Sequence, residues 1–285
     1  MSGRDTASRL QEARTKETLV VGLKGETRMA VVRKYSPGEY CWTDLGTTNV
    51  ASAKKFYRSI FGSKMTDFPM GAGDAKYSIL SVDGKDTCGL YPMASEQKKA
   101  PPVWLPYISV KSVADTAKKA KTAGGKICAA PTDVMDKGRM AVLQDPAGAA
   151  FAIWQPGKRK GAELNDTPGT VCWHDLNTSK PAAAGKFYAK VFGWKTSGEE
   201  YGGNEYHLFK LGKKNVCGMW PSPMKKLPPS WVTYWQVSDC AKSVAKVKRL
   251  GGRIIMGTTP VPGMCRFAIV RDPQGATFGI LEPEE

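Results

Sequence analysis

The sequence predicts an α+β protein made of two tandem copies of one domain. A length of 285 residues suits two domains. A content of 41% hydrophobic and 24% charged residues is typical of a globular chain. The decisive observation is an internal repeat, because YCWTDLG at residues 40–46 returns as VCWHDLN at residues 171–177, 131 positions later.

The repeat continues along both halves with slightly smaller offsets. Further matches join residues 55–57 to 186–188, 88–89 to 217–218, and 145–146 to 272–273. The offset changes only in segments rich in Gly, Pro or Lys, where loops absorb small deletions. We therefore predict an N-terminal extension at 1–37, a first domain at 38–157, a linker at 158–167, and a second domain at 168–285.

Each repeat is predicted to open with a short apolar strand, followed by a helix and further strands. The helices at 52–62 and 182–193 place Phe and Tyr on one face, and each ends at a glycine. Strand-like pieces follow, such as residues 76–84 and 87–92 in the first repeat.

The same order then begins again within each repeat. A strand (105–110; 232–237) precedes a helix (112–125; 240–252), and two clear strands close the repeat (138–145 and 149–155; 265–272 and 277–282). Each domain is thus predicted to hold two β-α-β-β-β units. Strands joined through crossover helices predict a mixed sheet with helices on its outer face.

Composition limits the partners and the location of the protein. A formal charge of +16 points to an anionic partner, but the basic pairs are scattered and none interleaves with aromatics, which disfavours nucleic acid. No stretch is apolar enough to span a membrane. The extension resembles neither a secretory signal nor a transit peptide, so the expected location is cytoplasmic. Its first fifteen residues are expected to be disordered, and residues 17–23 and 28–34 to form a hairpin.

The ordered set of motifs resembles a known family. The motifs are CW-x-DL-x-T, KFY-x-x-x-FG, a GG at a helix end, GRM-x-x-x-x-DP-x-G and a final strand ending in QP or EP. Together they look like the vicinal oxygen chelate superfamily, which includes glyoxalase I, the bleomycin-resistance proteins and extradiol dioxygenases. The resemblance implies two tandem glyoxalase-like domains, each a curved sheet around a cup, packed as a pseudo-dimer.

The resemblance also implies where a divalent metal would bind. Inward side chains from the first and last strands hold the metal in this family, which corresponds to His174 and Glu282 in domain two. These residues suit Zn, Fe, Mn or Ni, with Glu282 as a ligand or as the catalytic general base. The third family position falls near the apolar Val232, a departure from the pattern, and a purely structural role for the pair is the alternative. Domain one offers Thr43 and Gln155 there, so no metal is expected.

Other residues are candidates for contacting a ligand in the cup. Arg139 and Arg266 are equivalent in the repeat and could clamp an anionic substrate, although a position on the rim is the alternative. Tyr234, Trp173 and Trp235 are expected to line the cup of domain two and to stack on a planar ligand.

Three functions remain open from the sequence. The first is a metal-dependent lyase, isomerase or oxygenase-type enzyme that acts in domain two on a small oxygen-rich or aromatic molecule. The alternative is a metal-free protein that binds or sequesters a small molecule, anionic or aromatic, as bleomycin-resistance proteins do. The third is a basic scaffold for nucleic acid, which only the charge favours. A monomer with an internal pseudo-dimer and a homodimer are both compatible with the repeat.

Overall fold

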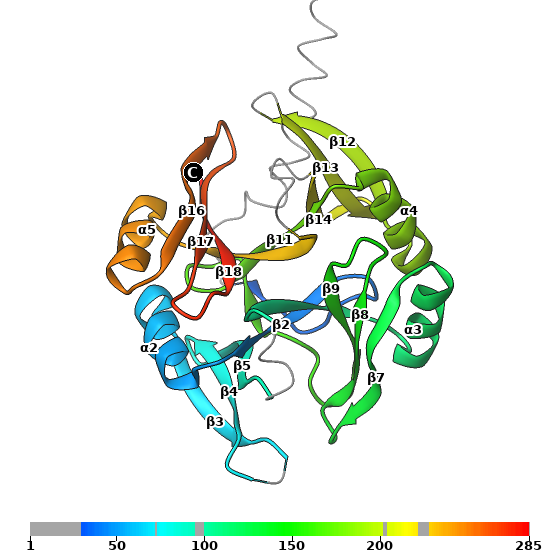
Figure 1. Ribbon diagram of the computed structural model, residues 1–285, viewed down its shortest axis with the longest axis horizontal. Helices are drawn as coiled ribbons and strands as arrows, with labels where there is room; N and C mark the ends of the chain where they lie inside the picture. The colour runs from blue at the N-terminus through cyan, green and yellow to red at the C-terminus, as the bar shows by residue number, and fades with distance from the viewer. Residues whose placement is uncertain (1–29, 72, 95–99, 202–203, 222–227, 285) are drawn as a thin grey trace, which may run out of the picture.

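The computed structural model describes residues 30–71, 73–94, 100–201, 204–221 and 228–284. Two eight-stranded sheets and four helices form most of this part of the chain (Figure 1). The predicted disorder of the first fifteen residues, and the predicted strand at 17–23, lie outside it. Within the described ranges, no helix is both long and apolar enough to cross a membrane.

Domain 1 forms one mixed sheet in the order β3-β4-β5-β2-β6-β9-β8-β7. Its elements are β2 (Tyr40–Thr47), α2 (Val50–Phe61), β3 (Lys64–Pro69), β4 (Lys76–Val82), β5 (Lys85–Pro92), β6 (Val103–Ser109), α3 (Val113–Thr122), β7 (Lys126–Val134), β8 (Gly138–Gln144) and β9 (Ala150–Pro156).

Domain 2 repeats this sheet in the order β12-β13-β14-β11-β15-β18-β17-β16. Its elements are β11 (Val171–Thr178), α4 (Pro181–Phe192), β12 (Lys195–Tyr201), β13 (Asn204–Leu211), β14 (Lys214–Pro221), β15 (Ser230–Gln236), α5 (Cys240–Arg249), β16 (Arg253–Val261), β17 (Cys265–Arg271) and β18 (Thr277–Pro283).

Both sheets have the mixed topology that the crossover helices predict. In domain 1, β2 pairs in parallel with β5, and β6 pairs in parallel with β9, while β2 and β6 meet as antiparallel strands at the centre. In domain 2, β11 and β15 take the places of β2 and β6. The predicted two β-α-β-β-β units per domain are therefore confirmed.

The first helix of each domain ends where its glycine predicts. Asn49 accepts a hydrogen bond from the backbone N–H of Ser52 and so begins α2. Gly62 and Gly193 follow α2 and α4 with φ values of 69° and 76°, a left-handed conformation that glycine adopts without steric cost.

The two domains pack back to back through their convex faces, which carry the helices. Figure 1 shows α2 beside α5 on one side of the molecule and α3 beside α4 on the other. Aromatic side chains fill the space between the sheets: the rings of Trp104 and Trp235 lie 4.5 Å apart, and Phe61 stacks on Trp235 at 5.3 Å. The concave face of each sheet, which we call cup 1 or cup 2 by domain, points away from the partner domain.

The linker also carries structure. β1 (Ala30–Val31) pairs with β10 (Leu164–Asn165), so the end of the N-terminal extension lies against the linker. The linker then crosses domain 1, because Ala162 donates its backbone N–H to the carbonyl of Cys41. These contacts place linker residues beside the beginning of β2.

Candidate ligand-binding site

A buried carboxylate lies at the centre of each cup. In cup 2, Asp175 Oδ1 accepts hydrogen bonds from Trp173 Nε1 (2.9 Å) and the Tyr206 hydroxyl (2.7 Å), and its Oδ2 accepts one from Trp220 Nε1 (2.9 Å). Burial raises the pKa of Asp175, and the bonds from Tyr206, Trp220 and Tyr234 oppose that shift. The aromatic donors therefore satisfy a carboxylate that is only 5% exposed.

Cup 1 contains the same arrangement at the equivalent positions. Asp44 Oδ1 accepts hydrogen bonds from Trp42 Nε1 (2.8 Å) and the Tyr77 hydroxyl (2.6 Å). Burial again raises the carboxyl pKa. The repeat thus preserves the Trp–Asp–Tyr part of the cluster, whereas Tyr91, the equivalent of Trp220, forms no hydrogen bond with another described residue. Sequence reasoning missed this cluster although Trp, Asp and Tyr all recur.

A glycine on the neighbouring strand makes room for each cluster. A methyl group at Gly218 would overlap the Tyr206 hydroxyl and the Asp175 carboxylate, and one at Gly89 would overlap the corresponding groups in cup 1. This close approach explains why the Cys-Gly pair occurs in both repeats.

His174 does not point into cup 2. Side chains alternate between the faces of a strand. Because Trp173 and Asp175 face the cup, His174 and its equivalent Thr43 face the core between the domains. The expected inward direction of His174 is therefore wrong by one position along the strand. His174 stacks on Tyr40 with ring centroids 4.1 Å apart, and its Nδ1 lies 3.1 Å from Thr233 Oγ1. Burial lowers the pKa of His174 to about 3, so the imidazole is neutral.

Glu282 lies at the N-terminus of a helix. Its Oε2 accepts a hydrogen bond of 2.8 Å from the backbone N–H of Cys240, the first residue of α5. The equivalent Gln155 does the same for Val113 at the start of α3, at 3.0 Å. Both side chains therefore bind the unpaired N–H groups of a helix end.

The structure does not bring His174 and Glu282 together. His174 is paired across the sheet with Thr233, whereas Leu281, the neighbour of Glu282, is paired with Gln236. Three residues along a strand correspond to about 10 Å, whereas ligands of one transition metal lie about 2.0–2.2 Å from the ion. The described residues contain no group of three or more His, Cys, Asp or Glu side chains able to hold an ion. The donor set of domain 2 therefore does not fit the family's metal centre.

The remaining candidates separate in the same way. Tyr234 and Trp173 face cup 2, where Tyr234 packs against Phe267. Trp235 lies in the core between the domains. Arg139 and Arg266 also lie on the convex side of their sheets, where Arg139 is 3.5 Å from Asp133 and Arg266 is 3.9 Å from Glu282. Neither arginine is positioned to clamp a ligand in a cup.

A pocket of about 290 Å³ lies where β2 and β11 begin, and we call it the junction pocket. Aromatic and charged side chains make up half of its twenty lining residues. Its lining residues are Val32, Lys34, Tyr35, Glu39, Tyr40, Cys41, Trp42, Thr43, Thr87, Ala162, Asn165, Asp166, Val171, Cys172, Trp173, His174, Lys213, Lys214, Asn215 and Val216.

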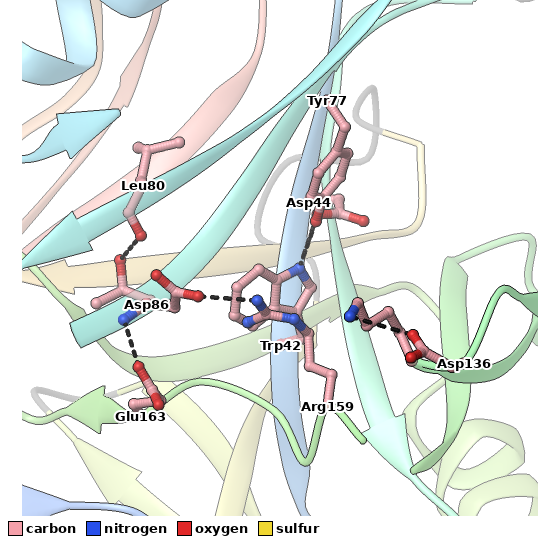
Figure 2. A network of polar contacts seen from close by, with 10 residues as sticks. Trp42, Asp44, Tyr77, Leu80, Asp86, Asp136, Arg159 and Glu163 are labelled. Carbon is pink, nitrogen blue, oxygen red and sulfur yellow. Dashed lines mark hydrogen bonds and ion pairs between the residues drawn. The ribbon is translucent and has the colours of Figure 1, made fainter. Parts of the chain in front are cut away.

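A residue of the linker covers Trp42 in domain 1. Figure 2 shows the Arg159 guanidinium over the Trp42 ring, 5.0 Å from its centroid, and bonded to Asp86 at 2.8 Å. Trp154 Nε1 fixes this segment by donating to the Arg159 carbonyl at 3.1 Å. The segment predicted as a plain linker therefore supplies a cation–π contact to cup 1.

A second cavity of about 500 Å³ lies beside Arg159 and is rich in basic residues. Its charge fits the anionic class of ligand expected from the sequence. However, Arg159 is paired with Asp86, and Lys137 and Lys158 are both paired with Asp136. Carboxylates of the protein therefore already neutralise part of the positive charge of this cavity.

Comparison with known proteins gives a consistent family match. Residues 41–153 and 170–280 match the family model described as the Glyoxalase/Bleomycin resistance protein/Dioxygenase superfamily. A Mycobacterium bovis protein named "Putative glyoxylase CFP32" is 36% identical over 252 residues, which cover 88% of this chain and 97% of that protein. "Anthracycline biosynthesis protein DnrV" of Streptomyces peucetius is 32% identical over 265 residues, with 88% and 96% covered.

Solved structures resemble the chain in fold. The Mn(II)-bound glyoxalase from Novosphingobium aromaticivorans aligns with a TM-score of 0.60 at 16% identity, covering 86% of this chain and 82% of that one. The 2,2',3-trihydroxybiphenyl 1,2-dioxygenase of Sphingomonas wittichii aligns with a TM-score of 0.60 at 12% identity, covering 87% and 90%. At such identities the likeness shows a shared fold alone, because this kind of fold supports many chemistries.

Proposed function

Since the chain belongs to the Glyoxalase/Bleomycin resistance protein/Dioxygenase superfamily, we propose that it binds a small aromatic or oxygen-rich molecule in the junction pocket without the aid of a metal ion. The observation that carries this proposal is the position of the Trp173 indole. The indole lines the pocket and is held in place by the buried carboxylate of Asp175.

The hydrogen bond from Trp173 Nε1 to Asp175 prepares the indole for stacking. Rigid aromatic groups bind with little loss of side-chain entropy, because their orientation is already fixed. Asp175 is itself anchored by Tyr206 and Trp220. Trp173 remains half-buried, so part of its surface is accessible from the pocket.

The polar side chains of the pocket favour a ligand with oxygen atoms. Three lysines line it against two carboxylates, and Lys214 is already paired with Glu39 at 2.7 Å. Lys34 and Lys213 form no ion pair with another described residue, so their ammonium groups are available as hydrogen-bond donors. Carbonyl, hydroxyl and carboxylate oxygens are the acceptors that such donors bind.

The size of the pocket limits the ligand. A volume of about 290 Å³ lies at the lower end of the roughly 300–1,000 Å³ of ordinary ligand pockets. One or two rings therefore suit it best. A similar protein is named for anthracycline biosynthesis, which supports an oxygen-rich aromatic class of ligand but not its size.

The residues of domain 2 favour this metal-free function over a metal-dependent lyase, isomerase or oxygenase. His174 is stacked on Tyr40, and Glu282 binds the end of α5. In the cup itself, Asp175 already accepts hydrogen bonds at both of its oxygens. We therefore assign Glu282 a structural role at the helix end rather than the role of a general base.

Calorimetric titration with 7-hydroxycoumarin, a planar two-ring probe, tests the proposal. We expect saturable binding that is unchanged by EDTA and at least about tenfold weaker in Trp173→Leu, because aromatic stacking and burial are lost. Trp154→Leu is the matched control, since Trp154 is outside the junction pocket. Absence of binding, loss of binding in EDTA, or equal effects of the two substitutions would each contradict the proposal.

A further inference from the structure

The duplication places Asn215 where domain 1 has Asp86. Residues 85–92 read KDTCGLYP, and residues 214–221 read KNVCGMWP. The structure confirms this equivalence: Asp86 pairs with Ser81 and Asn215 pairs with Lys210, each directly after an irregularity in the same hairpin. The Asp86 and Asn215 side chains have nearly the same shape, but only Asp86 carries a negative charge.

In domain 1, the negative charge of Asp86 balances the positive charge of Arg159, which lies over the Trp42 ring. Asp86 binds Arg159 at 2.8 Å while the guanidinium lies over Trp42 (Figure 2). Trp42 is consequently only 8% exposed. In domain 1, the face of Trp42 and the acceptor Asp86 thus together bind a planar group that donates a hydrogen bond, the guanidinium of Arg159.

In domain 2, the corresponding acceptor has no donor. Asn215 Oδ1 is buried and forms no hydrogen bond within the described part of the chain. Trp173 is half-buried, and no cation from the described residues lies over its ring. Both side chains line the junction pocket. Buried acceptors are nearly always paired in native proteins, so this oxygen marks a place for a donor.

We propose that Trp173 and Asn215 form a subsite for a neutral planar group that donates a hydrogen bond, such as the carboxamide of an aromatic amide. This inference rests on the proposed binding function and names the group that the pocket recognises. The planar group stacks on the indole and donates an N–H to Asn215 Oδ1, as Arg159 does to Asp86.

Charge selects the neutral donor. Asn215 cannot balance a cation as Asp86 does, and the ammonium group of Lys213 beside it, which forms no ion pair with another described residue, repels one. A carboxylate offers only acceptor atoms toward Asn215 Oδ1 and leaves that oxygen unpaired. An amide supplies the donor without either penalty, and its carbonyl oxygen remains free for a lysine.

Benzamide, benzamidinium and benzoate test the subsite because they share a shape and differ in charge. In calorimetric titrations of the full chain at neutral pH, we expect benzamide to bind at least about tenfold more tightly than benzamidinium. Asn215→Asp should reverse this order, because it restores the counter-charge found in domain 1. Asp86→Asn makes the same exchange in the opposite direction outside the pocket and should leave the benzamide affinity within about twofold.

The outcomes separate this inference from the proposed function. If 7-hydroxycoumarin binds but benzamide does not, or if benzamide still binds more tightly than benzamidinium in Asn215→Asp, the subsite is overturned while the proposed binding in the junction pocket is not. If neither 7-hydroxycoumarin nor any of the three probes binds, the proposed function itself fails. An unchanged thermal midpoint in Asn215→Asp shows that any change in order arises at the site.

Discussion

The hydroxyl of Tyr57 in domain 1 donates a hydrogen bond of 2.9 Å to the carboxylate of Asp272 in domain 2. The reciprocal pair, Tyr188 and Asp145, joins the domains a second time at 3.3 Å. Asp272 Oδ1 also accepts three backbone N–H groups of its own turn, at residues 274–276. The KFY and DP motifs, which appear unrelated in the sequence, therefore form one interdomain contact that occurs twice.

Tyr57→Phe should destabilise the whole chain rather than domain 1 alone. Asp272 is only 2% exposed, and losing a donor to a buried acceptor costs about 1–3 kcal/mol. Urea unfolding followed by tryptophan fluorescence measures the loss. Tyr91→Phe is the matched control, since the Tyr91 hydroxyl forms no hydrogen bond with other described residues and should change stability little. Equal stability of the Tyr57 variant and the wild type would contradict the interdomain role.

Gly218→Ala should disrupt the carboxylate cluster of cup 2. The added methyl group would overlap the Tyr206 hydroxyl and Asp175, and overpacking of this kind costs about 1–3 kcal/mol or more. Thermal unfolding checks the loss, with Gly257→Ala as control, because a methyl group there meets no atom within 4 Å. A Gly218 variant as stable as the Gly257 variant would mean that the cluster can rearrange at little cost.

Periodicity and turn chemistry predicted the units and their helices because those signals are local. The first helix of each domain carries an apolar face and ends at Gly62 or Gly193. Both features can be recognised in one sequence alone. The edge strands β7 and β16 had no predicted range of their own. Most of their residues are exposed on both faces, so no apolar alternation marks them.

The direction of the side chains in β2 and β11 could not be predicted. β2 is buried on both faces over nearly its whole length, so polarity does not distinguish the cup from the interdomain core. A bulge between Tyr40 and Trp42 also breaks simple alternation. The family resemblance placed His174 in the cup, but a one-residue slip moves every side chain to the opposite face, and Asp175 occupies the cup instead.

Glu282→Gln should leave both stability and metal content essentially unchanged. Gln155 already performs the same helix-end contact in domain 1, so glutamine can keep the bond to the Cys240 N–H. The loss of a carboxylate near a helix N-terminus costs only about 0.3–1 kcal/mol. Urea unfolding and elemental analysis of protein purified without chelators measure both quantities. A stoichiometric metal that is present in the wild type and lost in Glu282→Gln would overturn the structural role and restore the metal hypothesis.

The depressed pKa of His174 predicts a loss of stability in acid. Burial lowers its folded pKa to about 3, below the ordinary histidine value of 6.5. As pH falls through 6.5, the unfolded chain therefore binds a proton that the folded chain does not, and unfolding becomes easier. Over pH 7 to 4 this difference amounts to about 3 kcal/mol. His174→Gln lacks the titrating group, so the wild type should lose that amount relative to the variant in urea unfolding at each pH. A difference that stays constant from pH 7 to 4 would show that His174 accepts a proton in the folded protein.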